Sequence, residues 1–338
     1  MGNLHVHAAQ RPTTPLDIGV PPPPPLTAPP PTASASSGEA SESASGNGDE
    51  KRKLKNPGAY DELHRKAKDV CPVPLGGCKL LITKGLSPHF SVNHTLMLEQ
   101  QQPSSYTFGA TYVGAKQVSP VESFPVMMGE MDTTGALNSQ IIHLWRKGLR
   151  SKFIIQSLRG RFQGFQCDLE YRGPSYTAAA VLANPDFLSL SGMFVANYQQ
   201  SVSPHLVLGS ELMYQRSGIE QGGLLSFIAR YSTDTFIATA TVSRVALHLS
   251  YYHKGTPNSQ TSVEFQSSSL NQESSVTAAY QFDFPKANVT FRAAVDTNWQ
   301  VMSTVEKKLL PLPCSLILSG LINHRKQKCL FGIGLTVG

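Results

Sequence analysis

The sequence of 338 residues is poor in charged residues and has no long apolar run. Asp, Glu, Lys and Arg make up 15% of the chain, whereas an ordinary soluble protein has about 25%. A helical membrane protein would show stretches of about 20 apolar residues, and the sequence has none of that length. A strand with one face toward lipid and the other toward water requires neither many charges nor a long apolar run. The two absences together favour a transmembrane β-barrel.

Cysteine is scarce, and the signatures of common catalytic sites are missing. The five cysteines show no Cys-x-x-Cys spacing, which argues against a zinc site or a disulfide framework. The sequence has no Gly-x-Ser-x-Gly motif, no phosphate-binding loop and no cluster of His and acids at metal-binding spacing, so we expect no enzyme activity, no metal and no cofactor.

The formal net charge of +6 raises the question of nucleic-acid binding. Lys and Arg are spread singly along the chain, apart from one short cluster within residues 51–55. Because no recognised nucleic-acid motif accompanies this cluster, we predict no nucleic-acid partner.

Residues 1–55 form a Pro- and Ser-rich extension. Proline runs at residues 21–25 and 29–31 precede a tract of Ser, Ala, Gly and Glu. Such a composition cannot bury enough apolar surface to offset the entropy of ordering, so we predict a disordered extension with short polyproline II pieces.

Residues 56–78 are predicted to hold a short helix and a linker. The helix is expected over residues 57–70, with Asn56 as its N-cap and Pro57 at its first position. Tyr60, Leu63 and Ala67 share one stripe of this helix, which gives it a narrow apolar face.

Residues 79–338 alternate between apolar and polar side chains with a period of two. Phe165, Cys167, Leu169 and Tyr171 alternate with Gln166, Asp168, Glu170 and Arg172, a pattern typical of a strand between lipid and water. The same alternation recurs in residues 205–214, 276–284 and 329–337.

Turn signals at regular intervals separate these strands. They lie at residues 173–174, 184–186, 203–204, 217–218, 233–234, 255–258 and 285–288. Since a membrane strand has about 9–11 residues, the segment accommodates about 19 strands. A soluble all-β protein also alternates, but it rarely continues so evenly without a domain break. We therefore predict an all-β fold, a transmembrane β-barrel of about 19 strands.

Short motifs along residues 56–338 resemble the animal channel-forming subunit of the mitochondrial outer-membrane protein import translocase, within the eukaryotic porin superfamily. These motifs include Asn-Pro-Gly at 56–58, Lys-Gly-Leu-Ser at 84–87, Thr-Tyr-Val-Gly at 111–114, Glu-Tyr-Arg-Gly at 170–173, Leu-Pro-Leu-Pro at 310–313 and Asn-His-Arg-Lys at 323–326.

The resemblance implies a 19-strand barrel with parallel first and last strands and the N-terminal helix in the lumen. It also implies a homodimer of barrels in the mitochondrial outer membrane, with a helical receptor subunit between the barrels and small single-span subunits around them. The implied function is a protein-conducting channel that passes unfolded precursor proteins with cationic presequences.

The last strand resembles the family's insertion signal, which is a polar residue followed by spaced Gly and hydrophobic positions. Gly332, Leu335 and Val337 match this pattern, whereas Leu330 occupies the polar position. An amphipathic strand of this kind can pair with the open edge of an assembly machine.

Acidic side chains are expected on the inward face of the barrel, where screened attraction would hold a cationic presequence weakly and reversibly. The alternative is that they solvate the lumen and balance its basic residues. By alternation the inward acids are Asp168, Glu170, Glu211, Glu264, Asp283, Asp296 and Glu306.

Two ionisable residues fall on the predicted lipid face of the first strands. Lys84 shares a face with Leu80 and Ile82, and His94 shares one with Phe90. Because a charge on the lipid face costs about 2–4 kcal/mol at mid-depth, we expect a contact with a second barrel or with lipid headgroups. Alternatively, Lys84 snorkels to the interface and His94 is neutral.

Two other functions remain open at this point. One is a metabolite or anion porin of the same superfamily, and the other is a soluble β-rich binding protein or enzyme. The Pro-rich extension, the linker and the quoted motifs favour the import channel.

Overall fold

The computed structural model describes residue 54 and residues 56–99, 104–117, 122–186, 191–217, 220–270 and 272–338. The predicted disordered extension therefore lies outside the described residues, apart from residue 54.

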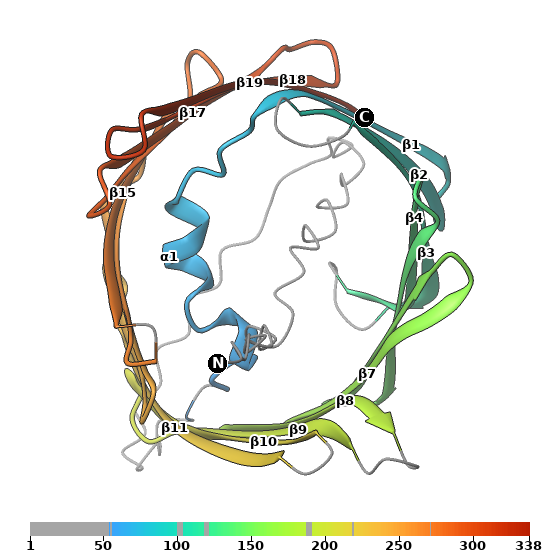
Figure 1. Ribbon diagram of the computed structural model, residues 1–338, viewed down its shortest axis with the longest axis vertical. Coiled ribbons are helices and arrows are strands. Elements are labelled where there is room, and N and C mark those ends of the chain that lie inside the picture. Colours follow the sequence, from blue (N-terminus) through green and yellow to red (C-terminus); the bar gives the residue numbers. More distant parts are fainter. Residues whose placement is uncertain are drawn as a thin grey trace, which may run out of the picture. The chain divides into compact units, whose positions relative to one another are not determined.

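Nineteen strands form one closed sheet (Figure 1), which confirms the predicted all-β barrel. Each strand is bonded to its neighbours in the sequence, and β1 is also bonded to β19. The strands are β1 (Gly77–Ser87), β2 (Phe90–Leu98), β3 (Ser105–Gln117), β4 (Ser123–Asp132), β5 (Ala136–Arg146), β6 (Leu149–Leu158), β7 (Arg161–Arg172), β8 (Tyr176–Asp186), β9 (Ser191–Ser201), β10 (Leu206–Ser217), β11 (Glu220–Ser232), β12 (Phe236–Ser243), β13 (Ala246–Thr256), β14 (Ser259–Ser268), β15 (Glu273–Phe284), β16 (Val289–Asp296), β17 (Gln300–Lys308), β18 (Cys314–Asn323) and β19 (Lys328–Val337).

The barrel closes through a parallel pairing of β1 with β19, which we call the seam. Its register runs from Gly77 opposite Gly332 to Ile82 opposite Val337. All other pairings are antiparallel. Because consecutive antiparallel strands alternate in direction, an odd number of strands leaves the first and the last pointing the same way.

Alternation along each strand produces two different faces. Outward positions carry large apolar side chains that remain exposed, such as Leu208 and Leu212 at 43% and 47%. Inward positions carry small and polar side chains such as Ser226 and Thr239, which are exposed by only 4% and 3%. The pattern read from the sequence therefore corresponds to an apolar outer wall and a polar lumen.

The predicted helix is present but is shorter and interrupted. A 3₁₀ turn, η1 (Tyr60–Glu62), precedes the helix α1 (Arg65–Val70). Asn56 is not an N-cap, because its Oδ1 accepts a hydrogen bond from the N–H of Gly58 (2.8 Å), well before α1 begins. In the described part of the chain, no helix is long and apolar enough to cross a membrane.

Two strand boundaries differ from the sequence pattern. The strand β1 begins at Gly77, slightly before residue 79. The Asn184-Pro185-Asp186 signal does not end β8, which continues through Asp186 with an irregular register after Ala183. Asn184 takes the left-handed backbone conformation (φ 47°) there, so a turn-forming residue produces a local irregularity within the strand.

Candidate functional site

Residues 56–76 run along the inner wall and form what we call the inner belt (Figure 1, blue). The belt begins at the hairpin between β7 and β8. Asn56 Nδ2 donates hydrogen bonds to the carbonyls of Gly173 (2.6 Å) and Tyr176 (3.1 Å). Asn56 thereby fixes one end of the belt to the rim of the barrel, at a hairpin more than 100 residues away in the sequence.

The middle of the belt, α1, packs on β14–β16. Ser262 Oγ donates a hydrogen bond to the carbonyl of Ala67 at 3.0 Å. Val70 is 1% exposed and packs against Ala279 and Ala294. Small side chains on the inner wall allow the helix to approach closely, and burying Val70 contributes about 1.5–3 kcal/mol.

His64 lies between η1 and α1 in a polar niche. Its Nδ1 is 2.7 Å from Ser250 Oγ, and its Nε2 is 3.0 Å from Thr241 Oγ1. Its ring stacks on His248 with the centroids 3.9 Å apart. Burial, assisted by the nearby His248, Lys68 and Arg230, lowers the pKa of His64 from 6.5 to about 3. His64 is therefore neutral at physiological pH.

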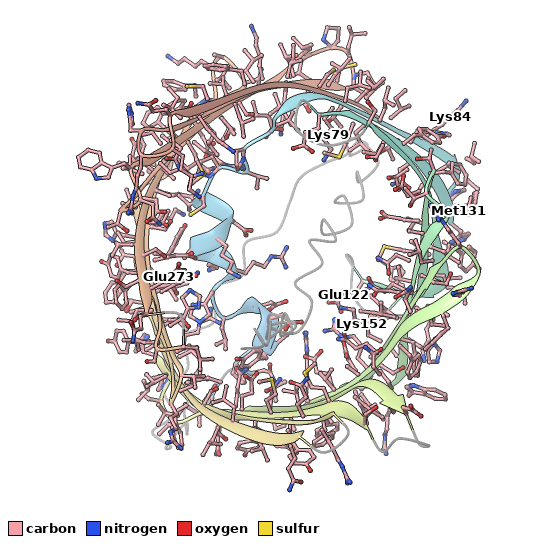
Figure 2. The ribbon with its side chains drawn as sticks, viewed as in Figure 1. Lys79, Lys84, Glu122, Met131, Lys152 and Glu273 are labelled. Atoms are coloured by element: carbon pink, nitrogen blue, oxygen red, sulfur yellow. The ribbon has the colours of Figure 1, made fainter. Side chains whose placement is uncertain are left out.

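Basic side chains hold two of the seven predicted lumen acids, both on β7. Glu170 forms ion pairs with Arg150 of β6 and with Arg172 on its own strand. Asp168 lies 4.0 Å from the Nζ of Lys152, which points into the lumen (Figure 2). These contacts match the alternative interpretation, in which lumen acids balance lumen bases.

The inner belt covers two further acids. The hydroxyl of Tyr60 hydrogen-bonds to Glu211 of β10, and burial together with this carboxylate raises the pKa of Tyr60. Glu264 of β14 is 8% exposed and lies within electrostatic range of Lys68 of α1. Both carboxylates therefore face the belt more than the open lumen.

Asp296 shapes the hairpin between β16 and β17. Its carboxylate accepts hydrogen bonds from Thr297 Oγ1 (3.1 Å) and Asn298 Nδ2 (3.0 Å). Short polar side chains commonly stabilise turns in this way. The position of Asp296 at the rim thus has a local structural explanation.

Asp283 and Glu306 form no ion pair with another described residue. Asp283 accepts hydrogen bonds from the amide of Gln281, and Glu306 makes no ion pair or hydrogen bond with another described residue. Thr290 of β16 is paired with Asp283 of β15 on one side and with Glu306 of β17 on the other. The two carboxylates therefore lie on a single row of the inner wall, about 10 Å apart by strand spacing.

A small cavity of about 120 Å³ lies beside Glu306, beneath the linker that follows α1. It is lined by Val73, Thr290, Arg292, Thr304, Glu306 and Ile317. Across the described residues, no group of three or more His, Cys, Asp or Glu could hold a metal ion.

On the outer wall, Lys84 and His94 are diagonal neighbours on β1 and β2. His94 is opposite Ile82, and Lys84 is the next outward residue of β1. Lys84 projects away from the lumen (Figure 2). His94 Nδ1 is 2.7 Å from the hydroxyl of Tyr106, which gives the imidazole a polar partner on an otherwise apolar face.

The residues of the predicted insertion signal divide between the two faces of β19. Leu335 is outward and 36% exposed, and Val337 has the same parity. Gly332 faces the lumen, where the backbone of Leu75 lies against it.

Arg172 was predicted as an inward base that balances the acids, but Arg150, Lys152 and the wall residues that contact the inner belt were not predicted. Arg150 and Lys152 are spaced two residues apart on β6, as Glu170 and Asp168 are on β7. Matching spacing across one hairpin was a usable signal. Single small polar residues such as Ser262 gave no such signal.

Comparisons with known proteins agree with this architecture. The eukaryotic porin family model matches residues 56–332. The protein called mitochondrial import receptor subunit TOM40 homolog is 49% identical to this chain in Bos taurus, over 84% of this chain and 79% of the relative. The human protein of that name has the same identity and coverage. The human subunit TOM40B is 41% identical over 84% of this chain and 92% of the relative.

Proposed function

This chain belongs to the eukaryotic porin family, and we propose that it is the protein-conducting channel through which precursor proteins cross the mitochondrial outer membrane. The observation that carries this proposal is the 49% identity to relatives named mitochondrial import receptor subunits, which extends over 84% of the chain. Such extensive identity favours the import channel over a metabolite or anion porin.

The channel acts passively in this proposal. An unfolded precursor with a cationic presequence threads through the lumen and is attracted by carboxylates that water and salt screen. Because the attraction is screened, the presequence is released as readily as it is bound. No chemical step is involved, and the chain requires no cofactor.

Conductance of the purified full-length protein in a planar bilayer tests this function. A cationic amphipathic presequence peptide is expected to block the current transiently. A scrambled peptide of identical composition, which has lost its amphipathic face, is the matched control. Equal and negligible block by both peptides, with free passage of small anions, would instead identify a metabolite porin.

Asp283 and Glu306 are the carboxylates that we propose for presequence contact, since neither forms an ion pair with another described residue. An exposed ion pair contributes about 0.2–1 kcal/mol, so each of Asp283→Asn and Glu306→Gln should shorten the peptide block by up to about fivefold. Asp234→Asn removes the same charge from the exposed hairpin between β11 and β12 and serves as the control. An equal effect of all three substitutions would indicate net charge alone.

We propose that the outer face around Lys84 and His94 contacts a second barrel, and that a receptor subunit and small single-span subunits complete the assembly. A polar pair on the lipid face gains from a protein partner, because the hydrocarbon tails of the lipids offer none. Cysteines introduced at positions 84 and 94 should give homodimer cross-links in intact membranes. Adducts from other strands but none from these two positions would favour lipid headgroups as their partner.

A further inference from the structure

The last residues of the inner belt lie at the seam. Leu75 rests against the inner face of β18 and β19, shortly before Gly77 enters β1. Its backbone N–H donates a hydrogen bond to Ser319 Oγ at 2.8 Å, and the same hydroxyl donates to the carbonyl of Leu75 at 2.8 Å. One hydroxyl of β18 therefore satisfies both backbone groups of the residue that leads into the first strand.

Gly332 of β19 provides the space for this contact. A Cβ atom at Gly332 would lie 2.2 Å from the carbonyl oxygen of Leu75 and 2.6 Å from its carbonyl carbon. Both are backbone atoms that cannot move aside as a flexible side chain could. The next inward residue, Gly334, is less restricted, because its Cβ would meet Leu75 only at Cδ2, 3.4 Å away.

The geometry at Gly77 explains why Leu75 must lie so close to the wall. Gly77 is paired with Gly332 across the seam, so the chain passes from the inner face of β19 into the plane of the sheet between residues 75 and 77. Gly77 has φ +99°, and a Cβ atom there would lie 2.1 Å from the carbonyl oxygen of Leu98. This sharp entry requires glycine, and it leaves Leu75 directly over Gly332.

We propose that Ser319 and Gly332 form a latch for Leu75 that positions β1 against β19 and completes the closure of the barrel. The latch reaches across the seam to β18, so it can form only when β1 lies beside β19. A slip of one residue would displace Leu75 by about 3.3 Å, which would break both hydrogen bonds to Ser319. The latch therefore selects the register of a short parallel pairing, in which hydrogen bonds are slightly weaker than in antiparallel strands.

This role is distinct from membrane insertion, and it accounts for glycine at position 332 in the finished barrel. An insertion signal acts while β19 meets an assembly machine. The contact between Gly332 and Leu75 acts in the folded protein, even when no assembly machine is present.

Refolding of the full chain in detergent micelles, without any assembly machine, separates the two roles. We expect Ser319→Ala and Gly332→Ala to lower the urea midpoint of unfolding. Gly320→Ala is the matched control, because Gly320 follows Ser319 in the sequence but faces outward. A Cβ atom at Gly320 would lie 3.6 Å from Phe331, an ordinary contact distance. If both Ser319→Ala and Gly332→Ala unfold at the wild-type midpoint, the latch proposal is wrong. Gly332 would then have a role in membrane insertion only.

Disulfide trapping in mitochondria tests the contact itself, even if Gly332→Ala inserts poorly. The chain carries Leu75→Cys and Gly334→Cys, which leave Ser319 and Gly332 in place, after its five native cysteines are replaced by serine. Only barrels resistant to alkaline carbonate are scored. We expect efficient cross-linking in the parent, which keeps Gly332, and in the control that also carries Gly320→Ala. With Gly332→Ala, the yield should fall by roughly tenfold, as expected when a close backbone contact is overpacked. Equal yields with Gly332→Ala, or no cross-link in the parent, would contradict the proposal.

Discussion

Individual lumen carboxylates differ in their partners, and the clearest case is Glu170. It is 8% exposed and held by Arg150 and Arg172. Glu170→Gln leaves two partly buried guanidinium groups without their carboxylate. We expect it to lower the free energy of unfolding by about 1–3 kcal/mol, as measured by urea unfolding in micelles.

Asp168→Asn on the same strand is the control for this prediction. Asp168 lies 4.0 Å from Lys152, and the two side chains are 21% and 33% exposed. Its substitution should therefore cost less than about 1 kcal/mol. Equal losses for Asp168→Asn and Glu170→Gln would mean that the paired arginines contribute no more than an ordinary ion pair.

The sequence placed seven acids on the inward face by alternation alone, and it could not distinguish among them. Their partners depend on strand register and on the inner belt. Glu170 meets Arg150 because β6 and β7 are paired in one particular register. Glu264 is covered because α1, nearly 200 residues away in the sequence, packs on it. A period of two contains information about faces but none about cross-strand neighbours.

At the scale of elements, the docking of α1 should depend on pH through His64. Burial beside His248 lowers the pKa of His64 to about 3. The undocked helix would bind a proton below about 6.5, its ordinary value, so acid favours undocking. Docking should therefore be strongest above pH 6.5 and weaken progressively as the pH falls toward 3.

A nitroxide label at Lys66→Cys, in a chain without other cysteines, reports this change. Lys66 is exposed on α1, so the label does not disturb the buried face. Its spectrum should show greater mobility between pH 6 and pH 4, and His64→Gln should remove most of that dependence. A mobility that is independent of pH in the parent chain would show that protonation of His64 does not loosen the helix.

The helix also shows where sequence patterns reach their limit. The stripe of Leu63 and Ala67 was predicted and is buried, at 4% and 3% exposure. The start of the helix was predicted wrongly, because Asn56 hydrogen-bonds to Gly173 and Tyr176 instead of capping a helix. Contacts across more than 100 residues override the local preference of Asn for an N-cap.

For the whole molecule, composition, length and alternation predicted a barrel and its number of strands, while the parallel pairing of the first and last strands was implied only by the family resemblance. Several antiparallel hairpins have turns that the sequence displays, such as those at residues 173–174 and 285–288. The seam joins two distant strands with no turn between them, so nothing local marks it. The contacts that stabilise the seam, from Leu75 to Ser319 and Gly332, likewise have no periodic signature.

The seam should accordingly be where the barrel opens first. It has six residue pairs in parallel register, from Gly77 and Gly332 to Ile82 and Val337, whereas β10 and β11 are paired antiparallel along their full length. Opening the seam breaks fewer and weaker hydrogen bonds than separating β10 from β11. Hydrogen exchange in micelles should therefore be roughly tenfold faster in peptides from residues 77–82 and 332–337 than in peptides from β11, equivalent to about 1.4 kcal/mol. Equal protection of both regions would mean that the barrel opens as one cooperative unit, and faster exchange after Ser319→Ala would tie the seam's opening to the latch.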